Sequence, residues 1–407
     1  MKFTKYRLGE LGRIVTGKTP NTSNPALWNG DVQFVTPEEL QHGKNILQTE
    51  RHLTQQGVKS IRGAFIPAES VCVSCIGNIG YVAKTIYPCV TNQQINTIIP
   101  SGAHSSDFLY YKLKSIWHYF KLREGNATTI PILSKSDFAN IAIHLPDLPT
   151  QLRIAGILGS LDEKIELNRK KIAELEALAK TIYDYWFVQF DFPDKNGKPY
   201  KSSGGKMVWN EQLKREVPEG WEVGKLLDIA TITMGQSPEG SSLNELENGT
   251  LFFQGSSDFG EVVPSNRVYT ISPTRMANSG DILLSVRAPV GATNIALLPC
   301  CIGRGLASLR GKDCSNVFIL QTLSLVRSRF AAKNVDGTTF GSLSKDELGG
   351  LEILKPPVAL VHVFDNLAMP IMEQVLGFVQ SIRETSSLRD TLLPLLMNGQ
   401  VSVGALK

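Results

Sequence analysis

The chain contains one long pattern twice, and this duplication limits the folds that it can adopt. The first copy opens at Tyr6 and the second at Trp221. The same landmarks then follow in the same order in each copy: Gly17-Lys-Thr-Pro20 and Gly235-Gln-Ser-Pro238, Ser74 and Ser285, Gly80 and Gly291, Pro88-Cys89 and Pro299-Cys300, Thr128-Thr129 and Thr338-Thr339, Ser134-Lys135 and Ser344-Lys345. A repeat of this length exceeds the roughly 20–50 residues of a solenoid unit. We therefore expect one domain to be present in two copies.

The composition is that of a globular protein. Of the 407 residues, 42% are hydrophobic and 20% are charged. No apolar run approaches the roughly 18 residues of a membrane span, and the first residues lack the apolar segment of a signal peptide. We therefore expect a cytoplasmic protein without a membrane partner.

The net charge of +4 is unevenly distributed. Residues 1–150 carry 15 Lys and Arg against 10 Asp and Glu, whereas residues 221–355 carry 12 against 13. A duplicated domain fits a partner with two-fold character, and DNA is the commonest one. Any DNA contact would have to use local patches of charge, because the bulk charge is small.

Both copies show the pattern of a mixed α+β domain. Short apolar runs broken by Asn, Gly and Pro predict strands, for example over residues 32–35, 71–75, 95–99 and 141–144. The second copy predicts strands over 282–286 and 351–354. Helices are expected over 107–122 in the first copy and 316–330 in the second.

A heptad pattern follows each copy. After the first copy, Thr150 is expected to cap a helix whose apolar positions over residues 154–182 would extend about 42 Å. A polar residue at one such position fixes the register of a coiled coil. The expected core positions of this helix are Ile154, Leu158, Leu161, Ile165, Asn168, Ile172 and Leu175. Those of the second helix are Phe364, Ala368, Ile371, Val375, Phe378 and Ile382. Pro370 predicts a kink in the second helix, and Asn398-Gly399 predicts its end.

These patterns predict an α+β protein with two similar globular domains. The domains are separated by two long helices that form an antiparallel coiled coil, with pseudo-two-fold character. The expected boundaries are residues 1–148 for the first domain, 149–188 for the first helix, 189–220 for a turn-rich surface connector, 221–356 for the second domain, 357–400 for the second helix and 401–407 for a tail.

The sequence lacks the patterns of the usual DNA-modifying enzymes. A methyltransferase needs an Asn/Asp-Pro-Pro-aromatic loop, but the one Pro-Pro pair, Pro356-Pro357, follows Leu354-Lys355. A nuclease needs clustered carboxylates, whereas Asp162-Glu-Lys164 spreads over different faces of a helix. Cys72-x-x-Cys75 has no second pair at zinc-site spacing, so we favour buried thiols.

Polar loop residues are the candidates for DNA contact. Asn92, Gln93, Gln94 and Asn96 carry amides, which bind adenine edges in the major groove, but the same amides could instead brace the loop. In the second copy the aligned Arg304 suits guanine or a phosphate. Further candidates for DNA contact are Lys18, Gln236 and Arg287. Lys135 and Lys345 stand at expected helix starts, where phosphate is the expected ligand.

Together these features resemble the specificity subunit of type I restriction–modification enzymes. The resemblance rests on the tandem domains, on Trp221-x-x-Gly224-x-Leu226, on Asp162-Glu-Lys-Ile-Glu-Leu-Asn168 and on the closing Leu388-Arg-Asp-x-Leu-Leu-Pro394 with Gly399. It implies a DNA-reading subunit without catalysis of its own, in which each domain reads one half of a split site on double-stranded DNA. It also implies that the helices set the gap and dock two copies of the modification (methyltransferase) subunit.

By the same resemblance, restriction (motor–nuclease) subunits bind beyond the modification subunits. S-adenosylmethionine, ATP and Mg²⁺ would then belong to the partner subunits, and this chain would hold no cofactor or metal. A purely structural scaffold is the alternative, because paired helices without a catalytic motif also fit that role.

Overall fold

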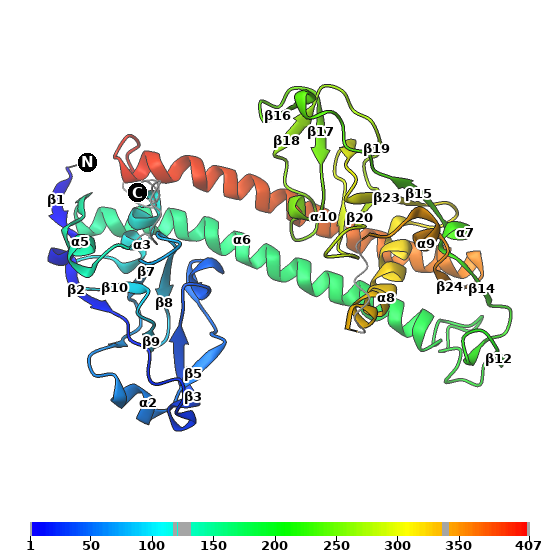
Figure 1. The fold of residues 1–407 in the computed structure, drawn as a ribbon, viewed down its shortest axis with the longest axis horizontal. Helices are drawn as coiled ribbons and strands as arrows, with labels where there is room; N and C mark the ends of the chain where they lie inside the picture. Colours follow the sequence, from blue (N-terminus) through cyan, green and yellow to red (C-terminus); the bar gives the residue numbers. More distant parts are fainter. Residues whose placement is uncertain (1, 117–119, 121–131, 336–341, 405–407) are drawn as a thin grey trace. The chain divides into compact units, whose positions relative to one another are not determined.

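The computed structural model describes residues 2–116, 120, 132–335 and 342–404. It divides into two compact units, one made of Met1–Leu167 with Ile382–Lys407 and the other of Asn168–Ser381. Each unit contains one copy of the duplicated sequence (Figure 1). The paired threonines at 128–129 and 338–339, and the predicted helical residues 117–119 and 121–122, lie outside the described residues.

The first unit combines three sheets with short helices. Its strands are Thr4–Arg7 (β1), Gly12–Thr16 (β2), Trp28–Val35 (β3), Asn45–Ile46 (β4), Arg51–Leu53 (β5), Phe65–Ile66 (β6), Val71–Ser74 (β7), Val82–Thr85 (β8), Cys89–Thr91 (β9), Ile95–Pro100 (β10) and Ala142–Leu145 (β11). Its helices, apart from the two long ones, are Leu8–Leu11 (α1), Gln55–Ser60 (α2), Ser106–Ser115 (α3) and Lys135–Asn140 (α5), with 3-10 turns at Pro25–Leu27 (η1) and Glu39–Gln41 (η2). The sheets have the orders β1-β11, β2-β10-β7-β8-β4 and β5-β3-β9-β6.

The central five-stranded sheet is buried on both faces. Side chains alternate along a strand, so Val71 and Val73 of β7 face one core and Cys72 faces the other. The core on the Cys72 side joins this sheet to the four-stranded sheet through Val35 and Cys89. The core on the opposite side packs it against α3, α5 and the long helices. The first domain is therefore two packed sheets covered by helices on one side.

The second unit repeats this topology. Its strands are Met207–Asn210 (β12), Arg215–Pro218 (β13), Glu222–Lys225 (β14), Ala230–Met234 (β15), Leu243–Asn244 (β16), Thr250–Phe253 (β17), Val268–Thr270 (β18), Met276–Ala277 (β19), Ile282–Ser285 (β20), Thr293–Ile295 (β21), Cys300–Ile302 (β22), Leu306–Gly311 (β23) and Glu352–Lys355 (β24). Its short elements are Leu226–Ile229 (α7), Asn316–Val335 (α8), Lys345–Gly349 (α9), Gly240–Ser242 (η4) and Ser256–Asp258 (η5).

Strand pairing confirms the predicted duplication. The order β15-β23-β20-β21 repeats β2-β10-β7-β8, and β14-β24 repeats β1-β11. The parallel pairing of β3 with β9 recurs between β17 and β22, with Val35 opposite Thr91 and Phe253 opposite Ile302. Parallel pairs need long connections, so their recurrence at matched positions indicates one fold used twice.

Two long helices follow the domains, Leu148–Tyr183 (α6) and Val358–Met397 (α10). The helix α6 starts before Thr150, and the carboxylate of Asp147 accepts the Thr150 N–H at 3.0 Å. The expected cap at Thr150 was therefore wrong, because Asp147 supplies the capping oxygen.

The helix α10 is one uninterrupted element through Pro370, whose side chain is exposed. It ends before Gly399, which has a φ of 71°. The predicted end is confirmed.

Within each unit the two helices run antiparallel. In the second unit Asn168 of α6 hydrogen-bonds Ser381 of α10, and Tyr183 contacts Phe364. As the residue number rises along one helix it falls along the other, which is the antiparallel arrangement that the sequence predicted. The buried predicted core positions are Ile154, Leu158, Ile165, Asn168, Ile172, Phe364, Ala368 and Val375. The half-buried ones are Leu161, Leu175, Ile371, Phe378 and Ile382.

In the first unit the helices are fastened to the domain through Asp162 of α6. Its carboxylate accepts a hydrogen bond from Tyr111 of α3 at 2.6 Å and from Arg389 of α10 at 2.8 Å. The side chains of Asp162 and Arg389 are only 13% and 18% exposed. Nearby, the ammonium of Lys112 donates to the carbonyl of Met397, at the end of α10, at 2.9 Å. These bonds connect one domain to both helices.

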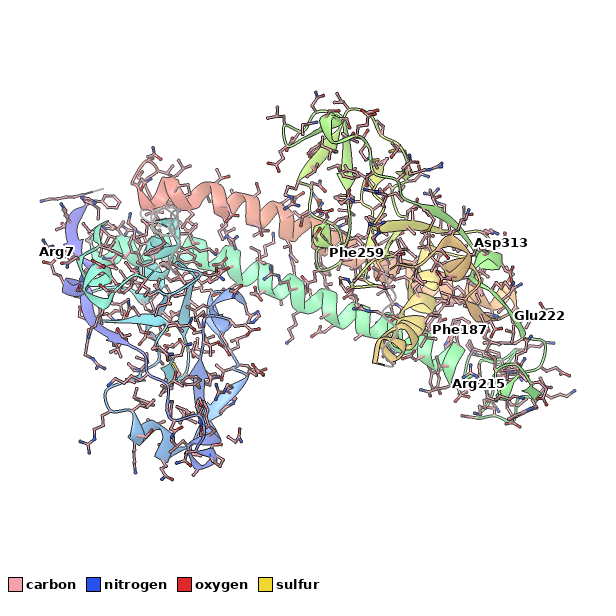
Figure 2. The ribbon with its side chains drawn as sticks, viewed as in Figure 1. Arg7, Phe187, Arg215, Glu222, Phe259 and Asp313 are labelled. Carbon is pink, nitrogen blue, oxygen red and sulfur yellow. The ribbon has the colours of Figure 1, made fainter. Side chains whose placement is uncertain are left out.

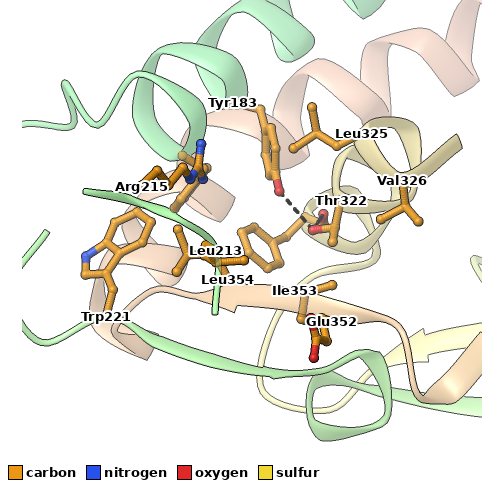
Figure 3. A pocket seen from close by; sticks show the side chains of 12 residues that line it. Tyr183, Leu213, Arg215, Trp221, Thr322, Leu325, Val326, Glu352, Ile353 and Leu354 are labelled. Carbon is orange, nitrogen blue, oxygen red and sulfur yellow. Dashed lines mark hydrogen bonds between the residues drawn. The ribbon is translucent and has the colours of Figure 1, made fainter. Parts of the chain in front are cut away.

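In the second unit aromatic side chains attach the domain to the two helices. The helix α6 ends in a π-helical turn, Asp184–Val188 (η3), which carries Phe187 (Figure 2). The ring of Phe187 contacts Phe318 and Phe364. The hydroxyl of Tyr183 lies 3.0 Å from that of Thr322, beside a cavity of about 180 Å³ (Figure 3). Burial raises the pKa of Tyr183 far above its ordinary value, so this hydroxyl stays neutral.

The segment 189–220 is largely exposed, as expected of a surface connector, and it also contains secondary structure. It contains the hairpin of β12 and β13. The ring of Phe192 stacks on Tyr200 and on Trp221, with centroid distances of 4.6 and 5.5 Å. Aromatic residues within the turn-rich stretch provide this packing, because each ring buries a large apolar area.

We predict that Asp162→Asn lowers the free energy of unfolding by about 2 kcal/mol, because Arg389 keeps the exposed Asp390 but loses its mostly buried carboxylate partner. The exposed pair Lys170–Glu174, with an N–O distance of 4.0 Å, provides the control. Glu174→Gln should cost no more than about 0.5 kcal/mol. Urea unfolding of both variants measures the difference, and equal effects would show that the Asp162 contacts do not stabilise the fold.

Candidate functional site

Four segments of the first domain meet at one edge, which we call the first loop edge: residues 17–19, 75–76, 91–94 and 132–135. The first three segments lie at the ends of β2, β7 and β9, and the fourth leads into the start of α5. Four main-chain hydrogen bonds join them: Gly17 N–H to Ile95 O at 3.1 Å, Lys18 N–H to Thr91 O at 2.9 Å, Cys75 N–H to Gln94 O at 2.7 Å and Leu133 N–H to Cys75 O at 2.8 Å. Main-chain hydrogen bonds therefore join all four segments of the edge.

The second domain has the same edge, the second loop edge, made of residues 235–237, 286–287, 302–305 and 342–345. Its matching bonds are Gly235 N–H to Leu306 O at 2.9 Å, Gln236 N–H to Ile302 O at 2.9 Å, Val286 N–H to Gly305 O at 2.9 Å and Leu343 N–H to Val286 O at 2.8 Å. An isolated β-bridge also recurs, between Ile76 and Ile132 and between Arg287 and Ser342. The two edges share one backbone frame.

Glycine is required where two backbone segments of this frame approach each other most closely. A Cβ atom on Gly17 would lie 2.1 Å from the carbonyl oxygen of Asn92, and one on Gly235 would lie 2.2 Å from that of Gly303. No side chain can occupy such a position without moving the backbone. This contact explains why the pattern Gly-x-x-Pro stands at the same place in both copies.

A serine bridge fixes the neighbouring turn in each domain. The hydroxyl of Ser74 donates to Asn78 O at 2.7 Å and accepts the Tyr81 N–H at 2.9 Å. Ser285 makes the same two bonds, to Pro289 O at 2.6 Å and from Ala292 at 3.0 Å. The repeated serines are therefore structural, and they position residues 75–76 and 286–287.

The structure brings most of the predicted contact residues together at the two edges. Exposed predicted residues are Lys18, Gln93 and Lys135 on the first edge and Gln236, Arg287, Arg304 and Lys345 on the second. Gln94 is half-buried. Each edge thus presents several cationic or amide side chains on one rigid frame.

Asn92 and Asn96 are placed differently, because both side chains are buried. Asn96 is 2% exposed, donates to Leu133 O at 3.1 Å and accepts from Thr16 at 2.6 Å. The amide of Asn92 donates to the Gln94 side chain and accepts the Gln94 N–H, both at 3.0 Å. These bonds support the loop-bracing interpretation, so we withdraw Asn92 and Asn96 from the proposed DNA contacts.

The helix starts at Lys135 and Lys345 are already neutralised by acidic side chains. Glu347 accepts the Ser344 N–H at 2.8 Å and its hydroxyl at 2.7 Å, and these bonds lower the pKa of Glu347. At the other start Ser134 donates to Asp137 at 2.9 Å. An anion site on these helix ends was expected and is not supported. The two lysines remain proposed phosphate contacts through their own charge.

Three residues of the edges were missed at the level of sequence. The hydroxyl of Thr19 donates to the carbonyl oxygen of the Gln93 amide at 2.5 Å. On the second edge the hydroxyl of Ser237 donates to the corresponding oxygen of Gln254 at 3.1 Å. Thr19 and Ser237 occupy matching places in the repeat, which was a usable signal. Gln254 lies on the loop after β17, where the first copy has Thr36, so the repeat gave no sign of it.

The loops that carry Thr36 and Gln254 are held by matching buried carboxylates. Glu39 accepts the Thr36 N–H and Asp258 accepts the Gln254 N–H, both at 2.7 Å. Glu39 and Asp258 are 9% and 8% exposed. We regard them as positioning residues for this part of each edge.

The cysteines other than the half-buried Cys314 are buried inside the domains, as the sequence indicated. Burial raises the pKa of the Cys72 and Cys75 thiols to about 12, so both stay protonated and are poor metal ligands near neutral pH. Among the described residues, no three His, Cys, Asp or Glu side chains are grouped to hold a metal ion. In the same part of the chain, no helix is long and apolar enough to cross a membrane.

Comparison with known proteins agrees with this architecture. The family model of the type I restriction–modification DNA specificity domain matches residues 1–177 and 218–360. The MjaIX specificity subunit of a type I restriction enzyme from Methanocaldococcus jannaschii is 27% identical, over 98% of this chain and 93% of that protein. The HindI specificity subunit from Haemophilus influenzae is 40% identical over 34% of this chain and 31% of that protein. The crystal structure of a type I S subunit from M. genitalium has the same fold, with a TM-score of 0.61 and 16% identity over 97% of this chain and 96% of that one.

We predict that changing Gln93 and Gln94 to Ala weakens or relaxes recognition of one DNA sequence element, by roughly 1–3 kcal/mol for each lost base contact. Lys135→Ala should instead weaken binding to all sequences alike and reduce its salt dependence. Asn96→Ala is the control, because it should lower stability without changing base preference. Binding to a panel of duplexes at several salt concentrations measures these effects. Full affinity and fidelity of the double glutamine variant would place base reading elsewhere.

Proposed function

Because this chain belongs to the family built from the type I restriction–modification DNA specificity domain, we propose that each of its two domains reads one half of a split DNA site. The chain is a DNA sequence-specificity subunit with two recognition domains. The proposal assigns the reading of bases to the first and second loop edges. Base edges carry the sequence information, while phosphate contacts set position.

One observation carries this proposal: the two edges share a backbone frame but differ in their side chains. Gln93 stands where the second domain has Arg304, and Lys18 stands where it has Gln236. Amides and guanidinium groups recognise different base edges. A common frame with different side chains is what two readers of different half-sites require.

The two long helices are proposed to set the distance between the half-sites and to bind the partner subunits. Both α6 and α10 contribute residues to both units, so their length can fix the separation of the half-sites. We further propose that two copies of the modification subunit dock on the helices and that the motor–nuclease subunits bind beyond them. S-adenosylmethionine, ATP and Mg²⁺ would act in those partners. The proposed location is the cytoplasm, where these partners meet DNA.

The alternative function, a structural scaffold, makes a different prediction for DNA binding. A gel shift with the modification subunit added separates the two functions. A reader should select one bipartite sequence from competitor DNA. A scaffold should leave selection unchanged when residues on the loop edges are substituted.

We predict that the purified chain alone neither methylates nor cuts DNA. The sequence offers no cofactor loop for methyl transfer and no carboxylate cluster for hydrolysis. Incubation with labelled S-adenosylmethionine and unmodified DNA measures methyl transfer, and a chain purified from cells without modification subunits excludes contamination. Methyl transfer under these conditions would overturn the non-catalytic assignment.

We predict that lengthening both helices changes the gap and leaves the half-sites intact. Four residues inserted after Leu167 of α6 and after Ser381 of α10 add about one turn, or roughly 6 Å, to each helix. This length corresponds to one or two base pairs at about 3.4 Å each. The methylated sites of the assembled enzyme should therefore show the same half-sites with a longer gap.

Two controls belong to the insertion experiment. Four residues inserted at Gly197, in the exposed turn of the connecting segment, should leave the gap unchanged. Leu161→Asp with Ile165→Asp should reduce activity altogether, because unpaired charge would be buried between the helices. An unchanged gap with full activity in the lengthened variant would show that the helices do not set the spacing.

A further inference from the structure

A hydroxyl holds a glutamine amide on each loop edge, although the glutamines come from different loops. On the first edge, Thr19 after β2 bonds Gln93 from the turn between β9 and β10. On the second edge, Ser237 after β15 bonds Gln254 from the loop between β17 and η5. Both glutamines are exposed. Each edge therefore has a hydroxyl bonded to a glutamine amide, but the glutamine comes from a different loop in each domain.

The direction of the hydrogen bond follows from the neighbours of the hydroxyl. Ser237 already accepts the N–H of Arg304 at 3.3 Å, so its own hydrogen is free for the oxygen of Gln254. Thr19 likewise donates to the oxygen of Gln93. In both pairs the carbonyl end of the amide is fixed against the protein. Because both side chains are exposed, the NH₂ end remains available as a donor.

An amide held in this way has one lone pair of its oxygen already occupied, whereas both NH₂ hydrogens remain available to a base. Adenine is bound by an amide that accepts from N6 and donates to N7 at once. Guanine presents two acceptors, O6 and N7, in the major groove. We infer that Gln93 and Gln254 each read a guanine through the NH₂ group, and that Thr19 and Ser237 set this preference by holding the amide oxygen. The inference rests on the proposed function, because it names the base that each edge reads.

Arg304 reinforces this chemistry on the second edge. Its backbone N–H bonds Ser237, which also holds Gln254, so the main chain of Arg304 lies beside the held amide. A guanidinium group also offers donors only, and it pairs with guanine O6 and N7. The second edge therefore has a guanidinium group in addition to its held amide, whereas on the first edge the position that matches Arg304 is occupied by the held Gln93 itself. We expect a stronger requirement for guanine in the half-site read by the second domain.

The test uses the enzyme assembled from this chain and its modification subunits. Each base pair of the two half-sites is changed in turn in synthetic duplexes, and the initial rate of methylation is measured. The wild-type enzyme should prefer G·C to A·T at one or more positions in each half-site. Thr19→Val should reduce this preference about tenfold in one half-site only, because the freed amide can turn and accept from adenine. Ser237→Ala should do the same in the other half-site.

Conservative variants separate this role from a loss of structure. Thr19→Ser and Ser237→Thr keep the hydroxyl and should keep the guanine preference. Ser23→Ala removes another exposed hydroxyl from the same loop region and should change nothing. Retention of the full guanine preference in Thr19→Val and Ser237→Ala would overturn the inference while the bipartite site remains. Absence of any bipartite site in the wild-type enzyme would instead overturn the proposed function itself.

Discussion

The two loop edges depend on main-chain hydrogen bonds that hardly involve the side chains they display. Gly17 and Gly235 permit the close approach of the turns, and Ser74 and Ser285 fix the adjacent turn. Because backbone groups carry the frame, side chains at Lys18, Gln236 and their neighbours can differ without loss of the fold. A recognition domain needs a main-chain frame that does not depend on its displayed side chains. The frame can then persist while the residues that read DNA change.

The domains are fastened to the helices by different interactions in the two units. The first unit uses the carboxylate of Asp162 with Tyr111 and Arg389, and the second uses the packing of Phe187 and Phe364. Duplication has preserved the strand topology more closely than these attachments. If the helices set the gap, as we propose, a rigid attachment matters in both cases, because the gap is fixed only while the domains do not move on the helices.

The sequence predicted the elements whose signal is periodic or repeated. The matching of β2-β10-β7-β8 with β15-β23-β20-β21 follows from the shared landmarks, and the antiparallel helices follow from the heptad spacing. The sequence did not distinguish Gln93, which is exposed, from Asn96, which is buried, because neighbouring loop amides can point either way. The sequence did not predict the secondary structure of segment 189–220, because the packing of this segment consists of a few aromatic rings. Gln254 was missed because the matching loop of the first copy has Thr36 at this position.

The central claim is that two copies of one frame read two halves of one DNA site. The most direct measurement is the mapping of methylated positions in DNA from cells that contain this chain with its modification subunit. The account predicts a single motif made of two short defined sequences, separated by an unread gap of fixed length. One uninterrupted motif, or methylation without a common sequence, would contradict it.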